Sequence, residues 1–552
     1  MDNSNAIFPD LILLDGQVIT MDDSKPRAEA VAVKWDKIVA VGSNQDILNL
    51  KGPKTQVINL GQKALLPGFI EPHSHFAMGG FQNLFFADLH SPPLGTIKNI
   101  KDLIEVLQEK TIQTSQGDWV YGLGYDDTLL EEQRHPTRDD LDKISKEHPI
   151  WIIHISGHFW VANSYALQMA GIKKSTPQPV GGKIRIDSTS GQPDGVFEEK
   201  PASALVSRHM PITTLKQRIE GIAYATKKYL QMGITSIYDA GVVFPGGDRS
   251  EILAYQKAIS DEILPLRVSM MIGVDFFMKS GGDDGPAFLT GFGDSRLKIG
   301  PAKILVDGSI QGYTGWLSQP YHVPFRGDKN YRGYPTIRPD RLKSIILRTH
   351  REGIQLACHG NGDAAIDTIL DAYRMALQKF PQPNARHRIE HCQMVREDQL
   401  DQMLELGISP SFFVSHVYYW GDRHKSIFIG PERAKRISPL NSARKRGIKF
   451  SIHSDYPVTP VSPLFCVHAA VNRTTQNGDT LGPEYRLTVE EALKAITIDA
   501  AWQNFEEKSK GSIEEGKLAD FTVITENPTT IDPKTIKDIG IDMVFIGGKR
   551  VH

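Results

Sequence analysis

The stretch "PGFIEPHSHF", residues 67–76, ends an apolar and extended run with two histidines that are separated by one residue. In a β-strand, residues two apart point to the same face. His73 and His75 would therefore stand side by side. They are either a pair of metal ligands at the end of a strand or two polar residues on a turn, and the rest of the sequence has to separate these interpretations.

The bulk composition is that of an ordinary globular chain. It has 552 residues, of which 40% are hydrophobic and 23% charged, and its formal net charge is -2. That length suits several structural units, and the balanced charge gives no reason to expect nucleic acid or an anionic membrane as a partner. No stretch reaches the roughly 18 uncharged apolar residues of a membrane span, and the N-terminus lacks a signal-peptide pattern. We therefore expect a cytoplasmic protein.

The three cysteines, Cys358, Cys392 and Cys466, do not form a CxxC pair. An odd number of cysteines argues against a disulfide framework. Each lies beside apolar residues, so we expect buried free thiols.

The two ends of the chain share one pattern. Residues 1–65 and 512–552 read as short strands in which hydrophobic and polar residues alternate, with Gly, Asn or Asp between them. This pattern predicts one small β-sandwich domain that is built from both termini.

Residues 66–511 repeat a different unit, a short apolar run that ends in polar residues and is mostly followed by an amphipathic helical pattern. Buried strands that alternate with helices indicate parallel β/α units. Together with the strand before His73 there are eight such strands, the number that closes a (β/α)8 TIM-type barrel. The other seven strands lie in "GITSIYDAG", "LPLRVSMMIG", "PAKILVDGS", "GIQLACHGNGD", "RHRIEHCQ", "GISPSFFVSH" and "GIKFSIHSDYPV".

Polar side chains gather at the C-terminal ends of these strands, the face on which barrel enzymes build their sites. Packing alone does not predict histidine at the end of strand after strand. Imidazoles and carboxylates are the usual ligands of hydrolytic zinc sites. The residues in question are His73, His75, Asp239, Asp307, His359, His391, His416 and Asp455.

A long insertion interrupts the barrel pattern after the first strand. We predict that residues 90–230 form an insertion subdomain within the barrel, as a lid or a subdomain over its mouth. This segment holds several of the tryptophans of the chain.

Several motifs occur in the same order as in a known family. The chain resembles the amidohydrolase superfamily of metal-dependent hydrolases, and within it the amidohydrolase-3 group, which includes YtcJ-like proteins and N-substituted formamide deformylases. The resemblance covers nearly the whole chain. The motifs that carry it are "LPGFIEPHSHF", "HPTRDDLD", "GHFWVANSYAL", "AKILVDGS", "HGNGDAAID", "RIEHCQ", "HSDYPV" and "GSIEEGKLADFTVI".

The resemblance implies a site for one or two divalent metal ions, with zinc as the expected metal. It implies that the first, more buried ion is bound by two histidines and an aspartate, that the second ion is bound by two further histidines, and that a carbamylated lysine bridges them. The implied ligands are His73, His75, Lys303, His359, His391 and Asp455.

Two of these residues also have a chemical rationale. Lys303 lies inside an apolar strand, where burying an ammonium ion is costly. Carbamylation by CO2 would turn it into an anionic bidentate ligand, whereas the alternative is an ion pair with Asp307 or another carboxylate. Asp455 is implied to be the general acid/base, which takes a proton from metal-activated water and gives it to the leaving nitrogen.

Five further residues are candidates for substrate binding, and three of them have a structural alternative. His158 matches a family position but could cap the next helix, Tyr125 could be packing, and His416 could satisfy a loop carbonyl. Gln311 and Tyr313 lie in "DGSIQGYTGWL", where many YtcJ-like members have a Leu-Gly-Ser-Arg type of stretch. This departure predicts a substrate that differs from theirs.

The resemblance thus implies a hydrolase that cleaves the C–N bond of an amide or N-substituted formamide in a small molecule. A deaminase or cyclic-amide hydrolase is the alternative on the same barrel, because function lies in the loops and not in the fold. A deaminase would need one metal and no bridging lysine. A third interpretation is a regulatory or assembly protein with little catalysis. A homodimer is expected only because dimers are the commonest assembly.

Overall fold

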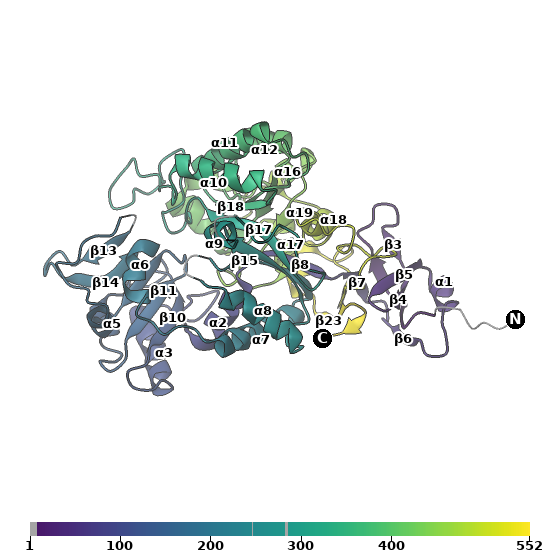
Figure 1. The fold of residues 1–552 in the computed structure, drawn as a ribbon, viewed down its shortest axis with the longest axis horizontal. Coiled ribbons are helices and arrows are strands. Elements are labelled where there is room, and N and C mark those ends of the chain that lie inside the picture. Colours follow the sequence, from purple (N-terminus) through teal and green to yellow (C-terminus); the bar gives the residue numbers. More distant parts are fainter. Residues whose placement is uncertain (1–7, 181, 245–246, 282–284) are drawn as a thin grey trace. The chain divides into compact units, whose positions relative to one another are not determined.

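The computed structural model describes residues 8–180, 182–244, 247–281 and 285–552 (Figure 1). The chain divides into two compact units. The barrel unit comprises Met1–Phe76, Ala225–Pro457 and Val461–His552, and the insertion unit comprises Ala77–Tyr224 and Val458–Pro460. Within the described ranges, none of the helices combines the length and the apolar character that crossing a bilayer requires.

The barrel unit contains an eight-stranded parallel sheet that forms a nearly closed barrel. This confirms the predicted α/β fold with a TIM-type barrel, and the eight strands fall in the eight expected sequence runs. They are β8 (Phe69–Ser74), β15 (Ile234–Val242), β16 (Arg267–Gly273), β17 (Leu297–Leu305), β18 (Leu356–Gly360), β19 (Arg388–His391), β20 (Ser409–Phe412) and β21 (Ser451–Ile452).

Helices follow the barrel strands, as parallel connections require. In α11, buried residues recur at helical spacing and Ile369 packs on the strand before it. A Cβ at Gly360 of β18 would lie only 2.9 Å from Ile369 Cδ1, so glycine lets this helix approach the sheet. These helices are α8 (Ser250–Ser260), α9 (Val274–Lys279), α10 (Pro339–Arg351), α11 (Asp363–Lys379), α12 (Glu397–Leu406), α16 (Leu440–Lys445), α17 (Pro463–Asn472), α18 (Val489–Ala495) and α19 (Ile498–Gln503).

Both ends of the chain contribute to two further sheets, with strand orders β5-β4-β1-β6 and β24-β23-β22-β7-β2-β3. In the second sheet, β22 from the C-terminal region pairs antiparallel with β7 from the N-terminal region. A common apolar core lies between these strands. Their bounds are β1 (Leu11–Leu14), β2 (Gln17–Ile19), β3 (Arg27–Ala28), β4 (Ala30–Lys34), β5 (Lys37–Gly42), β6 (Gln56–Asn59), β7 (Ala64–Pro67), β22 (Phe521–Ile524), β23 (Ile541–Ile546) and β24 (Lys549–Arg550).

The apolar run before the two histidines is not one strand, as the sequence suggested, but two strands in different sheets. β7 pairs with β2 and β22, and β8 pairs with β15. The chain changes sheet at Gly68, where a Cβ would lie 2.2 Å from Thr235 Oγ1. Only glycine permits this close passage, and its effect is to bring the two histidines to the end of a barrel strand.

The insertion unit is built on a six-stranded sheet with the order β13-β14-β12-β11-β10-β9. The strands β9, β10 and β11 run parallel, and the others pair antiparallel. Two apolar clusters pack in this unit, and one of them contains Trp119, Trp151 and Trp160. The elements are β9 (Ala87–Asp88), α3 (Ile100–Ile112), β10 (Val120–Tyr125), α4 (Arg138–Leu141), β11 (Ile150–His154), β12 (Phe159–Ala162), α5 (Ser164–Met169), β13 (Lys183–Ile186), β14 (Pro193–Glu198) and α6 (Lys200–Ser207).

The cysteines behave as expected. Cys358, Cys392 and Cys466 are all free and buried. Burial raises the pKa of the Cys358 thiol to about 12, so this thiol stays protonated at neutral pH.

Candidate metal centre

Two histidines and one aspartate converge at the C-terminal end of the barrel sheet. His73 Nε2 lies 3.4 Å from Asp455 Oδ1, and His75 Nε2 lies 3.6 Å from the same oxygen. The two imidazole rings are 5.8 Å apart between centroids, so they stand side by side as their spacing predicted. Two imidazole nitrogens and a carboxylate oxygen around one point form a ligand set that suits a divalent metal ion.

Lys303 and His391 adjoin this group. Lys303 Nζ lies 3.3 Å from His73 Nε2, and His391 Nδ1 lies 3.9 Å from Asp455 Oδ2. Both side chains are buried. Neither His391 Nδ1 nor Asp455 Oδ1 has a hydrogen-bond partner among the described residues. Buried polar atoms are normally satisfied, so these two atoms fit a bound cation.

Burial shifts the charges of this group toward neutrality. It lowers the pKa of Lys303 to about 8, although Glu390 and Asp455 act in the opposite direction. It also raises the pKa of Asp455 well above its usual value, against the effect of Lys303. A lysine with a lowered pKa offers more neutral amine at physiological pH, and the neutral amine is the form that can react with CO2.

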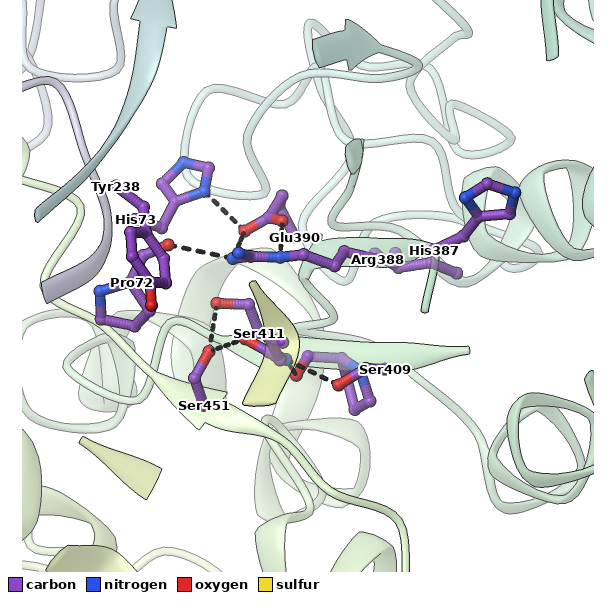
Figure 2. Close-up of polar contacts among 12 residues, drawn as sticks. Pro72, His73, Tyr238, His387, Arg388, Glu390, Ser409, Ser411 and Ser451 are labelled. Carbon is purple, nitrogen blue, oxygen red and sulfur yellow. Dashed lines mark hydrogen bonds and ion pairs between the residues drawn. The ribbon is translucent and has the colours of Figure 1, made fainter. Parts of the chain in front are cut away.

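A buried carboxylate fixes the orientation of His73. The Nδ1–H of His73 donates to Glu390 Oε2 at 2.6 Å, and Glu390 is in turn paired with Arg388, whose Nε lies 2.8 Å from Oε1. Figure 2 shows this series of polar contacts. It returns to the neighbour of His73, because Arg388 Nη2 donates to the carbonyl of Pro72 at 2.9 Å. Because Glu390 accepts the Nδ1 proton, the Nε2 lone pair of His73 faces Lys303 and Asp455, the tautomer that a metal ligand needs.

His453 is a further buried histidine that the sequence analysis missed. Its ring centroid lies 4.7 Å from that of His73 and 5.2 Å from that of His391. Neither of its ring nitrogens has a hydrogen-bond partner in the described part of the chain. Burial lowers its pKa well below the usual value, so it is a neutral imidazole. The signal was present in "SIHSD", where His453 precedes Asp455 by two residues.

His359 is oriented differently from the other expected ligands. Its ring lies 4.4 Å from that of His391, but its Nε2 lies 3.2 Å from the Gly308 carbonyl and 3.1 Å from Asn361 Nδ2. Asp307 holds the same loop by accepting hydrogen bonds from the Asn361 and Gly362 amides. The role of His359 as a metal ligand therefore stays a prediction, whereas Asp307 holds the loop that contains Asn361 and Gly362.

The backbone at the site adopts conformations that favour glycine. His391 has φ 71° and Asp455 has φ 55°, both in the left-handed region. Such residues cost about 1–3 kcal/mol each and cluster at functional sites. Gly241 is a glycine that the packing requires, because a Cβ there would lie 2.6 Å from His75 Nδ1. Glycine at this position leaves the space that the His75 ring occupies.

The sequence matches the amidohydrolase family over residues 56–552. The chain belongs to the amidohydrolase family. It is 28% identical to the N-substituted formamide deformylase of Arthrobacter pascens, over 98% of this chain and 97% of that protein. It is also 28% identical to YtcJ of Bacillus subtilis (strain 168), over 97% of this chain and 98% of that protein. These matches confirm the resemblance inferred from the motifs.

A solved structure agrees with the fold. The crystal structure of an uncharacterized metal-dependent hydrolase from Pyrococcus horikoshii OT3 superposes with a TM-score of 0.75. It covers 95% of this chain and 99% of the other, at 24% sequence identity. At that identity the likeness supports the fold alone.

Three of the residues predicted to bind substrate in this amidohydrolase-family chain lie in the barrel unit. Gln311 is buried, and its Oε1 has no hydrogen-bond partner among the described residues. Tyr313 packs in an aromatic cluster, with its ring 4.8 Å from both Tyr321 and Phe325. We expected His416 at the end of a barrel strand, and this is wrong. The strand β20 stops four residues earlier, and His416 begins the helix α13 (His416–Tyr419).

The other two, His158 and Tyr125, lie in the insertion unit and have local partners there. His158 Nδ1 lies 3.1 Å from Glu199 Oε2, and the helix α5 is capped by Asn163 instead of His158. Tyr125 is fully buried, and its hydroxyl lies 3.0 Å from His135 Nδ1. Packing accounts for Tyr125 in this unit, and a substrate role for either residue stays a prediction.

Proposed function

We propose that this chain is a metal-dependent hydrolase that cleaves the C–N bond of an amide or N-substituted formamide in a small molecule. The observation that carries the proposal is the convergence of His73, His75 and Asp455, with Lys303 and His391 beside them, at the C-terminal end of the barrel sheet. The similarity to an N-substituted formamide deformylase supports this substrate class.

The proposed ligands are the six residues named from the motifs, and zinc suits their nitrogen and oxygen atoms. When bound, the metal would lower the pKa of a water to about 7 and polarise the substrate carbonyl. The two oxygens of Asp455 then divide the work. Oδ1 faces His73 and His75 and would hold the metal, whereas Oδ2, on the side of His391, would take a proton and return it to the leaving nitrogen.

Lys303 would contribute a second anionic ligand as its carbamate. Its Nζ stands next to the metal-facing nitrogen of His73, and its lowered pKa favours the reactive amine. This position supports a hydrolase with a bridged metal pair over a deaminase, which would need no such lysine.

The test is turnover of a panel of N-substituted formamides and simple amides by zinc-loaded protein. Release of amine and carboxylate is expected from the wild type and not from Asp455→Asn. The proposal fails if fully metal-loaded wild type turns over no member of the panel. Metal content, measured in parallel, separates an empty site from an inactive one.

A further inference from the structure

A second group of histidines and carboxylates lies in the insertion unit. Asp126 and Asp127 directly follow β10, and His154 is the last residue of β11. These strands are parallel neighbours, with Tyr125 paired opposite His154, so their C-terminal ends meet at one edge of the sheet. Ligand atoms of Asp126, Asp127 and His154 all lie within 4.8 Å of one another.

The two imidazoles of this group face a single carboxylate. His154 Nε2 lies 3.1 Å from Asp127 Oδ1, and His135 Nε2 lies 3.6 Å from Asp127 Oδ2. Each histidine therefore takes its own oxygen of Asp127. Two imidazole nitrogens that converge on one carboxylate form the ligand pattern of a transition-metal site.

The Nε2 atom of His154 is buried and has no assigned hydrogen bond among the described residues. His154 is 3% exposed, and Asp127 Oδ1 lies 3.1 Å from this nitrogen. A buried nitrogen without an assigned hydrogen bond is an exception that calls for an explanation. A cation beside Asp127 would supply the missing contact.

The opposite side of each ring contacts a hydroxyl. His135 Nδ1 lies 3.0 Å from the Tyr125 hydroxyl, and His154 Nδ1 lies 2.8 Å from Ser156 Oγ. A hydroxyl can accept the Nδ1 proton and so leave the Nε2 lone pair toward Asp127. The Ser156 amide, 3.1 Å from His154 Nδ1, suits the opposite tautomer. A measurement of the tautomer of His154 therefore tests whether its Nε2 is free to bind a metal ion.

We propose that Asp127, His135 and His154, with Asp126 alongside, bind a divalent transition-metal ion of the zinc class in the insertion unit. The two nitrogen donors select zinc, cobalt or nickel over calcium and magnesium, which prefer oxygen ligands. The ligands come from β11 and from the loop after β10, so the ion ties this loop to the sheet. This site is separate from the six ligands of the barrel unit and does not depend on their assignment.

The experiment uses the full chain with the barrel ligands removed by His73→Gln and Asp455→Asn. The apo protein is titrated with Co2+, and the visible absorption of bound cobalt and the metal content after gel filtration are measured. This background should retain about one ion per chain, as expected for a single mononuclear site. Adding His154→Gln should abolish that binding. Adding His90→Gln is the matched control, because His90 pairs with Asp88 in the same unit but lies outside the group.

Circular dichroism of each variant reports whether the chain is folded, and His135→Gln replaces His154→Gln if the latter is not. Nitrogen chemical shifts of the imidazoles give a second readout, since Nε2 of His154 should shift when zinc is added. The proposal is overturned if the background binds no cobalt or zinc. It is equally overturned if His154→Gln and His135→Gln bind as the background does, which would leave a hydrogen-bonded Asp127 network.

Discussion

The barrel unit and the insertion unit both place histidines and carboxylates at the C-terminal ends of neighbouring parallel strands, but they enclose them differently. In the barrel, the Asp455 side chain is 10% exposed, and parallel strands flank the group on both sides. In the insertion unit, the Asp127 side chain is 25% exposed, and the neighbour of β11 on its far side is the antiparallel β12. That neighbour begins with Phe159, an aromatic ring 4.8 Å from His135, where another barrel strand would offer a polar end.

This difference shows what closure of the sheet adds to a group of ligand-type side chains. Two parallel strand ends suffice to bring two or three ligands together. A barrel adds ligands from the remaining strands and a buried layer behind them, of which Glu390 and Arg388 are the example. We therefore expect catalysis in the barrel group and metal binding without catalysis in the insertion group.

The largest expected effect contrasts the two aspartates. Asp455→Asn should lower kcat by about a thousandfold, because it removes both a metal ligand and the proton acceptor. Asp127→Asn should leave kcat unchanged while removing metal from the insertion unit. Initial rates at saturating substrate, with metal content determined for each variant, check this. An equal loss of kcat in the two variants would contradict the proposal that only the barrel group is catalytic.

The second prediction concerns Lys303. Protein that is equilibrated with 13C-bicarbonate and zinc should show a carbamate carbonyl signal in the 13C spectrum, and Lys303→Ala should lack it. The control is Lys510→Ala, since Lys510 is also buried but its Nζ is paired with Glu506 at 3.0 Å. A carbamate signal that survives in Lys303→Ala would place the modification elsewhere and remove the bridging ligand from the barrel group.

The third prediction addresses the layer behind the barrel ligands. Glu390→Gln should weaken metal binding by about 10- to 100-fold, since a carboxylate that orients a metal-bound histidine has effects of this size. Competition against a chromogenic chelator measures the affinity. Glu506→Gln is the control, because Glu506 is a buried carboxylate of the same unit that is paired with Lys298 and Lys510. If both variants bind metal equally well, the orientation of His73 does not depend on Glu390.

The smallest expected effect comes from the space around His75. Gly241→Ala should displace the His75 ring, cost about 1 kcal/mol or more of stability and lower metal affinity by less than Glu390→Gln does. Gly42→Ala is the control, since a Cβ there meets only ordinary contacts at 3.8 Å. Thermal unfolding with and without zinc measures both quantities. An unchanged response to zinc in Gly241→Ala would show that His75 tolerates the shift.

The sequence determined the architecture of the barrel and the identity of most of its polar strand ends. Eight apolar runs separated by helical patterns were enough to predict an eight-stranded parallel sheet, because buried parallel strands read as continuous hydrophobic runs. The spacing of His73 and His75 was enough to predict that they share a face, because strand side chains alternate. Burial of the three cysteines also followed from their apolar neighbours.

The tertiary structure decided what the local pattern does not encode. The split of the apolar run at Gly68 depends on Thr235, more than a hundred residues away, and the tautomer of His73 depends on Glu390. The approach of His135 and His154 to Asp127 likewise follows only from the folded chain. Periodicity reports which residues are buried, whereas the direction of a ring nitrogen is set by its neighbours across the sheet, and these belong to distant parts of the chain.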